Sequence, residues 1–356
     1  MLESIRSKVM AGERLNRNDA MALMMTEDIF TLGELASVSS ERHNANRAYF
    51  VRNIHVNPTN ICVNRCRFCA FSRSRGEEGA YEMSTRQIIG RIRKAMPLSE
   101  VHLVGGLHPD WPFEHYLKMV RSIKRSFPLL HLKAFTAAEI DYMMKISGLG
   151  LTEVLRALRE AGLDAMPGGG AEIFAPSVRN MLCPEKITGE RWLEVIEAAH
   201  LAGIRTNATM LYGHLEKPSH RVDHLMKLRE LQDRTGGFQA FIPLSYQPDN
   251  TEIGGSGISG LDDLRTIAVS RLVLDNFAHI KAYWVMLGEK VSQLALCFGA
   301  DDLDGTIVEE KITWSAGQRS RRGITAGELR RLIKKAGKRP VERDSFYRAV
   351  RGSRSA

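Results

Sequence analysis

Three of the five cysteines, Cys62, Cys66 and Cys69, fall within eight consecutive positions. Thiolates are soft ligands that suit iron–sulfur clusters and zinc. A structural zinc site usually takes four protein ligands in two spaced pairs, whereas the local set here ends at three. A cubane cluster on three thiolates leaves one iron open to the amine and carboxylate groups of a small molecule. The spacing therefore predicts an iron–sulfur cluster. Buried structural cysteines, or zinc with a distant fourth ligand such as Cys183, are the alternatives.

The elements that must position this loop follow a regular order. From about residue 51, short apolar segments alternate with amphipathic stretches. Such alternation implies parallel strands with crossover helices, and eight units can close a (β/α)₈ barrel. We predict this α/β barrel, with a doubly wound open sheet as the alternative. The strands are expected at residues 50–56, 101–104, 131–135, 163–166, 206–210, 239–243, 280–284 and 294–298.

The barrel is expected to cover residues 51–316, after an N-terminal helical segment at 1–50. Residues 317–356 are expected to form a basic helical extension packed on the barrel. The net charge of +9 belongs to that end, because residues 318–356 hold 13 of the 50 Lys and Arg but 3 of the 41 Asp and Glu. A basic tail can bind nucleic acid. Leu329, Leu332 and Ile333 recur at helical spacing, however, and no aromatic platform for bases lies between them, so we expect no nucleic-acid partner.

Composition excludes several classes of protein. Hydrophobic residues make up 44% and charged residues 26%, which is typical of a globular chain and not of a disordered one. No apolar run approaches the roughly 18 residues of a membrane span, and the N-terminus lacks the apolar centre of a signal peptide. The odd number of cysteines argues against a disulfide framework. We therefore expect a cytoplasmic protein without a membrane span.

The cysteine spacing, with Phe68 directly before Cys69, resembles the signature of the radical S-adenosylmethionine (SAM) superfamily. The resemblance implies a barrel with a 4Fe-4S cluster on Cys62, Cys66 and Cys69, where SAM is cleaved to a 5′-deoxyadenosyl radical. It also implies cofactor-binding residues: Gly105 and Gly106 for the methionine amino group, Phe68 against the adenine and Glu172 near the ribose. The simpler alternatives are a turn at the two glycines and a helix cap at Glu172.

Further stretches resemble the branch of this superfamily that acts in futalosine-dependent menaquinone synthesis and in deazaflavin synthesis. They are residues 57–62, 66–71, 105–109, 167–172, 241–243 and 247–251. Residues 133–140, 279–284, 298–306 and 339–344 match most closely the members that join the adenosyl radical to 3-[(1-carboxyvinyl)oxy]benzoate. In that transferase reaction SAM is consumed as a substrate and a carboxylate is lost. The resemblance also implies a one-electron reductant such as flavodoxin or ferredoxin.

Two alternatives stay open for the activity. One is a sibling radical enzyme, either the cyclase acting on dehypoxanthine futalosine or the deazaflavin-forming hydroxyphenyl transferase. The other is a zinc-stabilised RNA-binding protein with a basic tail, which would be colourless and would bind RNA in a salt-sensitive way.

A substrate with two carboxylates needs cationic or hydrogen-bonding partners, and arginine pairs bidentately with carboxylate. By predicted strand position we expect substrate contacts from Arg52, Arg205 and Lys281. We expect proton donors or hydrogen-bond partners from three histidines, His108, His214 and His279. His220 and His224 share a helix face; we interpret them as a solvated polar face and not as zinc ligands.

Overall fold

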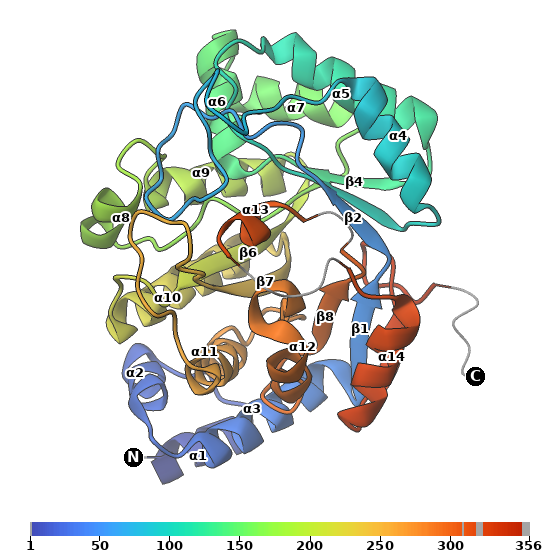
Figure 1. Cartoon of the computed structure of the whole chain (residues 1–356). Coiled ribbons are helices and arrows are strands. Elements are labelled where there is room, and N and C mark those ends of the chain that lie inside the picture. The colour runs from blue at the N-terminus through green and yellow to red at the C-terminus, as the bar shows by residue number, and fades with distance from the viewer. Residues whose placement is uncertain (1, 308–309, 318–322, 351–356) are drawn as a thin grey trace.

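The computed structural model describes residues 2–307, 310–317 and 323–350 (Figure 1). Three helices come first: α1 (Leu2–Ala11), α2 (Arg17–Met25) and α3 (Ile29–Asn44). Helix α2 begins where the side chains of Asn16 and Asp19 each accept a hydrogen bond from the other's backbone N–H. Helices α2 and α3 pack against α11 (Gly260–Val273), so this segment covers one side of the barrel.

The parallel ring that the alternation predicts has eight positions: seven are taken by strands, the first of them divided into two segments, and one by the bridged residues Ile280 and Lys281. Six segments pair in chain order: β2 (Asn53–Val56), β3 (Glu100–Leu103), β4 (His131–Ala134), β5 (Ala165–Met166), β6 (Arg205–Tyr212) and β7 (Phe238–Ser245). Strand β1 (Arg47–Val51) pairs in parallel with β8 (Asp302–Gly305). Single parallel bridges at Ile280 and Lys281 connect β7 to β8. Because β1 continues into β2 through Arg52, the pairing runs around the ring, and the predicted (β/α)₈ fold is confirmed.

The helices around the ring bury one apolar face each. In α4 (Thr85–Ala95), Ile88 and Ile92 lie four residues apart and are fully buried, and Ser84 caps the first turn. The other covering helices are α5 (Phe113–Ser126), α6 (Ala137–Ser147), α7 (Leu151–Ala161), α8 (Pro176–Leu182), α9 (Gly189–Leu201), α10 (Pro218–Thr235) and α12 (Trp284–Ala295).

The eighth strand differs from the prediction. Residues 294–298 end helix α12 and the turn after it, and the strand is β8, a few residues further on. Leu294 is 53% exposed whereas Ala295 is buried, as on one face of a helix. Strand β8 carries Asp302 and Asp304, and two acidic residues in four argue against a buried strand when the sequence is considered alone. The predicted strand at residues 280–284 is also reduced. Ile280 and Lys281 each form a single bridge, and helix α12 begins at Trp284.

The sequence predicted a helical C-terminal extension, but the described part of this segment also contains a strand. Helices α13 (Ile312–Ser315) and α14 (Ala326–Lys335) are followed by strand β9 (Arg339–Glu342), which pairs in parallel with the outer side of β1. Leu329 and Ile333 of α14 are fully buried, and the helix contacts β1 and β8. Residues 318–322 and 351–356 of the predicted extension lie outside the described residues. The first barrel strand begins at Arg47 and not at residue 50, and the division into three parts stays a prediction.

Within the described chain, none of the helices is long and apolar enough to cross a membrane.

Candidate active site

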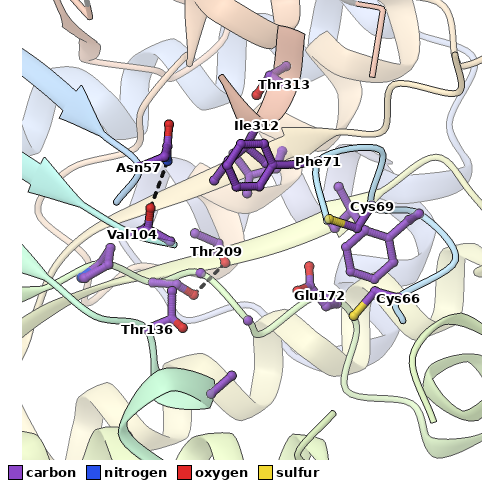
Figure 2. Close-up of a pocket in the computed structure, with 18 of the residues that line it drawn as sticks. Asn57, Cys66, Cys69, Phe71, Val104, Thr136, Glu172, Thr209, Ile312 and Thr313 are labelled. Atoms are coloured by element: carbon purple, nitrogen blue, oxygen red, sulfur yellow. Dashed lines mark hydrogen bonds between the residues drawn. The ribbon is translucent and has the colours of Figure 1, made fainter. Parts of the chain in front are cut away.

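A cavity of about 300 Å³ opens at the carboxyl ends of the barrel strands. Figure 2 shows Cys66, Cys69 and Glu172 on one side of it and Asn57, Val104 and Thr209 on the other. This is the end at which parallel barrels gather the loops that follow their strands. The loop after β2 supplies the thiols, and the loops after β3, β4 and β5 supply glycines, a threonine and two carboxylates.

Cys62, Cys66 and Cys69 all line this cavity as half-buried free thiols. Backbone hydrogen bonds hold their loop: the Cys62 N–H donates to the Arg73 carbonyl at 3.1 Å, and the Arg67 N–H donates to the Leu182 carbonyl at 2.9 Å. Among the described residues, no three Cys, His, Asp or Glu side chains already surround a common metal position. The thiols therefore share a cavity wall without converging.

Without a cation beside them, the thiols of Cys62 and Cys69 are held in the protonated form. Burial raises the pKa of both the Cys62 and the Cys69 thiol, and the neighbouring cysteines raise them further. A cation beside the sulfurs reverses this balance and stabilises thiolates. Three free thiols on one loop are the soft donors that an iron–sulfur cluster takes, so the residues present fit such a cluster. The buried Cys183 acts on the pKa of the Cys66 thiol, so the structure brings the distant fourth cysteine beside the loop.

Gly105 lines the cavity, and Gly106 lies behind it against the cysteine loop. The Gly105 N–H donates to Glu139 Oε1 at 3.2 Å, and the Gly106 N–H donates to the Thr59 carbonyl at 2.9 Å. A Cβ atom on Gly106 would collide with the Ile61 carbonyl and approach Cys62 Cβ to 3.1 Å. Glycine is therefore required where the end of β3 meets the loop that carries the thiols.

Gly106→Ala is expected to displace Ile61 and Cys62 and to lose most of the iron that the reconstituted protein binds. The measurement is iron per chain after anaerobic reconstitution. Gly90→Ala is the matched control, because a Cβ on Gly90 in helix α4 meets no atom within 4 Å. Equal iron content in the two variants would contradict the packing argument.

Glu172 and Lys186 form an ion pair on the cavity wall, with Lys186 Nζ 2.6 Å from Glu172 Oε1. Burial alone would raise the pKa of Glu172, but Lys186 outweighs it and the pKa is lowered, so the carboxylate stays charged. Lys186 Nζ also lies 5.5 Å from the centre of the Phe68 ring, which lines the cavity. Glu172 is not a helix cap, because α8 begins after Ala175 without a side-chain cap.

The three residues expected to hold substrate carboxylates do not reach the cavity. Arg52 lies between β1 and β2 and pairs with Glu342 at 2.8 Å. Arg205 is the exposed first residue of β6, at the opposite end of the barrel. Lys281 lies inside the barrel, with its Nζ 3.3 Å from Asp304 Oδ1 and only 2% of the residue exposed. The prediction rested on their closeness to predicted strands. The sequence does not tell at which end or on which face of a strand each side chain lies.

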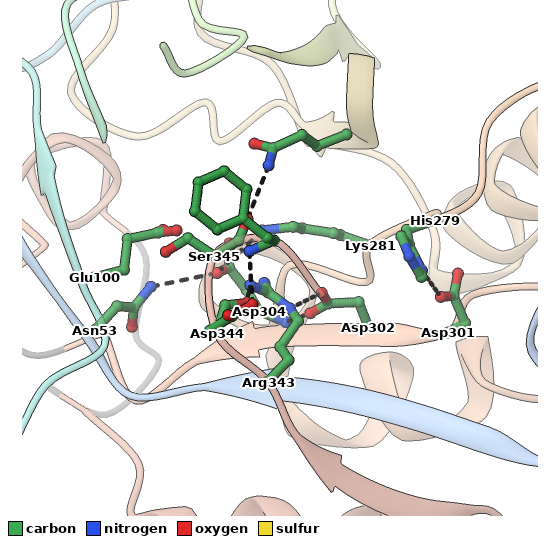
Figure 3. A network of polar contacts seen from close by, with 12 residues as sticks. Asn53, Glu100, His279, Lys281, Asp301, Asp302, Asp304, Arg343, Asp344 and Ser345 are labelled. Atoms are coloured by element: carbon green, nitrogen blue, oxygen red, sulfur yellow. Dashed lines mark hydrogen bonds and ion pairs between the residues drawn. The ribbon is translucent and has the colours of Figure 1, made fainter. Parts of the chain in front are cut away.

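The three histidines expected to be catalytic do not line the cavity either, and each lies against a carboxylate. His108 Nε2 lies 3.2 Å from Glu82, with its ring stacked on Trp111. His214 Nδ1 lies 3.0 Å from Glu216. His279 Nδ1 lies 2.6 Å from Asp301, as Figure 3 shows. The predicted solvated face is wrong for His224, which is fully buried with its Nε2 against the Thr209 carbonyl at 2.9 Å.

The segment after β9 closes the amino-terminal end of the barrel. Figure 3 draws its residues 343–345 together with Asn53, Glu100 and Asp302, the first residues of β2, β3 and β8. Arg343 is fully buried, with its Nε 2.7 Å from Asp302 Oδ2. Gln239 donates to the Ser345 carbonyl at 2.8 Å, and the Tyr347 ring stacks on His279 with 3.5 Å between centroids. His279 and Lys281 therefore belong to a buried polar network below the cavity.

Sequence reasoning missed several polar residues of the cavity. They are His55, Asn57, His102, Thr136, Glu139, Lys186, Asn207, Gln247, Tyr283, Asp304 and Glu310. A signal for two of them is present, since His55 and His102 alternate with apolar residues along β2 and β3. In a parallel strand whose outer face is covered by helices, such alternation indicates a polar inner face. Glu139 is also marked by the T-x-x-E capping box that it forms with Thr136.

Burial raises the pKa of Glu139 to about 7, and the backbone N–H groups of Thr136 and Gly105 act against that rise. Its Oε2 accepts from the Thr136 N–H at 2.7 Å and its Oε1 from the Gly105 N–H. This carboxyl therefore ties the end of β3 to the start of α6 within the cavity wall.

Comparison with known proteins covers nearly the whole chain. Residues 56–228 match the family described as "Radical SAM superfamily", and residues 235–354 match "CofH/MqnC C-terminal region". A Thermus thermophilus protein named "Aminodeoxyfutalosine synthase" is 49% identical over 98% of this chain and 95% of its own length. A Streptomyces coelicolor protein of the same name is 43% identical over 98% and 93%.

A Methanopyrus kandleri protein named "5-amino-6-(D-ribitylamino)uracil--L-tyrosine 4-hydroxyphenyl transferase" is 42% identical over 85% of this chain and 84% of its own. Two solved structures share the fold. Methylornithine synthase (PylB) superposes with a TM-score of 0.75 at 19% identity over 95% of this chain and 97% of that one. The FeFe-hydrogenase maturase HydG from Carboxydothermus hydrogenoformans gives 0.75 at 16% identity over 97% and 80%.

Proposed function

This chain belongs to the radical SAM superfamily, and on that premise we propose that it joins the 5′-deoxyadenosyl group of SAM to 3-[(1-carboxyvinyl)oxy]benzoate. Rearrangement and loss of a carboxylate then give 6-amino-6-deoxyfutalosine, a step of menaquinone biosynthesis. One observation carries the proposal: the 49% identity, over 98% of the chain, to a protein named "Aminodeoxyfutalosine synthase".

The family assigns this enzyme a 4Fe-4S cluster and SAM. We place the cluster on Cys62, Cys66 and Cys69, where it would supply the electron that cleaves SAM. Phe68 offers an aromatic face to the adenine from the same loop. Gly105 and Gly106 allow a close approach of the backbone to the methionine group.

Two carboxylates complete the SAM pocket in this proposal. Glu172, kept charged by Lys186, accepts hydrogen bonds from ribose hydroxyls. Glu139 holds the Gly105 backbone in place through its Oε1. The apolar side chains of Phe71, Ile242 and Leu244 line the same cavity and exclude water from the reacting carbons. A small one-electron carrier such as flavodoxin or ferredoxin is the proposed reductant.

The proposal is tested by reconstituting the protein with iron and sulfide without oxygen and adding a reductant, SAM and 3-[(1-carboxyvinyl)oxy]benzoate. Mass spectrometry is expected to detect 6-amino-6-deoxyfutalosine. If only 5′-deoxyadenosine and methionine form, the substrate is wrong, and the substrates of the sibling cyclase and hydroxyphenyl transferase are tried next. Intact SAM and bound zinc would contradict the cluster assignment.

Glu172→Gln is expected to raise the Kd for SAM roughly tenfold to hundredfold, because a hydrogen bond to a charged group contributes about 1.5–3 kcal/mol. The measurement is equilibrium binding of SAM to the reconstituted protein. Glu190→Gln is the matched control: Glu190 pairs with Lys227 at 3.1 Å on the surface. Unchanged SAM affinity in Glu172→Gln would remove Glu172 from the pocket.

A further inference from the structure

Two histidines on adjacent strands meet at the inner wall of the cavity. His55 of β2 and His102 of β3 are paired in register, and both line the cavity. His102 Nδ1 lies 3.2 Å from His55 Nε2, and the rings meet edge to face at 4.4 Å. Nothing in the proposed binding of the cluster or of SAM uses this pair.

The hydrogen bond between the two rings leaves one outer nitrogen without a proton. Each neutral imidazole has one N–H donor and one acceptor, so a pair that shares one proton ends in one donor and one acceptor. His102 Nε2 is buried and has no hydrogen-bond partner among the described residues. A buried polar atom without a partner is costly and indicates a missing ligand or proton.

The charges that face the pair are already balanced. Glu100 and Asp304 face it with negative charge, and Lys133 and Lys281 face it with positive charge. Lys133 Nζ lies 2.9 Å from Glu100, and Lys281 Nζ lies 3.3 Å from Asp304. Beyond them, Arg343 pairs with Asp302. The network therefore offers no free positive charge to a ligand in the cavity.

Burial is then the largest influence on both rings. It lowers the pKa of His55 to about 4 and holds the pKa of His102 well below its usual value. The pair is therefore uncharged near pH 7 in the free protein. A carboxylate placed against it would favour the protonated form, because an opposite charge at short range raises the pKa of an imidazole.

The proposed substrate carries two carboxylates, and the cavity offers few cations to meet them. Lys186 is the one Lys or Arg among the described lining residues, and Glu172 holds it. The aromatic part of the substrate finds apolar surface beside the histidines, because Tyr283 stacks parallel to His55 with 6.3 Å between centroids and Ile242 lines the same cavity.

We propose that the His55–His102 pair binds one carboxylate of this aromatic diacid and takes up one proton from solvent as it does so. The proton bonds to the free imidazole nitrogen, the N–H donates to the carboxylate, and no bond of the substrate breaks. The identity of the ligand rests on the proposed function. The pair is thus a substrate-binding element that acquires its charge only when the substrate arrives.

The test measures proton uptake on binding. The reconstituted protein is titrated calorimetrically with 3-[(1-carboxyvinyl)oxy]benzoate, without SAM or reductant, at pH 7 in two buffers of different ionisation enthalpy. We expect close to one proton to be taken up per molecule bound. Because uptake of one proton accompanies binding, the Kd is expected to rise roughly tenfold per pH unit between pH 6 and 7. This measurement needs no variant.

His102→Asn keeps an amide nitrogen near the Nδ1 position and removes Nε2, so we expect it to abolish proton uptake and to weaken diacid binding by at least tenfold without changing SAM affinity. His200→Gln is the control: His200 is partly buried against Thr206 and Thr235, away from the cavity, and its variant should keep the uptake. Binding without proton uptake by the unmodified protein, or uptake that persists in His102→Asn, overturns the inference alone. Failure of the diacid to bind at all, with SAM still bound, overturns the proposed function and the inference together.

Discussion

Replacing any one of Cys62, Cys66 or Cys69 by alanine is expected to abolish SAM cleavage and to remove most of the iron. The physical reason is that three thiolates from one loop must together offset the positive charge of the cluster, and two of them leave a second iron without a protein ligand. The measurements are iron and sulfide per chain and the amount of 5′-deoxyadenosine formed after anaerobic reconstitution. Turnover that survives in any of the three variants would refute the cluster assignment.

Cys183 and Cys297 provide the matched controls for this experiment. Cys297 is exposed and lies outside the cavity, so Cys297→Ala is expected to behave like the unmodified protein. Cys183→Ala is the sharper control, because Cys183 lies beside Cys66. Retained iron and turnover in Cys183→Ala would support a site of three cysteines. Loss of metal in this variant as well would favour a site of four thiolates, the zinc alternative.

Arg343→Met is expected to lower the free energy of unfolding by about 3–5 kcal/mol, because it leaves the carboxylate of Asp302 buried without a counter-ion. Both side chains are 0% exposed, and Arg343 Nε lies 2.7 Å from Asp302 Oδ2. Urea unfolding followed by circular dichroism measures the change. Combining Arg343→Met with Asp302→Asn is expected to recover most of the loss, since the buried charge is then removed as well.

A surface ion pair of similar geometry is the control for burial. Arg17 Nε lies 2.6 Å from Asp223, with both side chains about half exposed at 48% and 46%. Arg17→Met is expected to cost no more than about 1 kcal/mol, because water screens an exposed pair. Equal losses in Arg17→Met and Arg343→Met, or a double variant at Arg343 and Asp302 as unstable as the sum of the single variants, would contradict the explanation.

The resemblance to the superfamily and the fold were within reach of the sequence for local reasons. Cys62, Cys66 and Cys69 lie in one short loop, so their spacing alone places three soft ligands together. The covering helices follow the same local logic: in α4 and α5 the apolar residues recur at helical spacing.

The residues that would surround the substrate could not be predicted from the sequence. The expected cations carry the right charge but do not line the cavity. Arg52 and Lys281 are paired with carboxylates, and Arg205 lies at the opposite end of the barrel. Strand β8 escaped prediction because its acidic residues are acceptable in a buried strand only when cations from elsewhere in the chain neutralise them. Arg343 meets Asp302 across 41 positions.

The sequence by itself determined the parallel barrel, the cysteine loop and the family, since periodicity and motif spacing are properties of neighbouring residues. Only the tertiary structure decided which polar side chains face the cavity and which pair with one another in the buried network at the other end of the barrel. That choice depends on where the strand ends meet and on which buried charges find partners, and both depend on contacts between segments far apart in the chain. His55 and His102 face each other because two strands 47 residues apart lie in register.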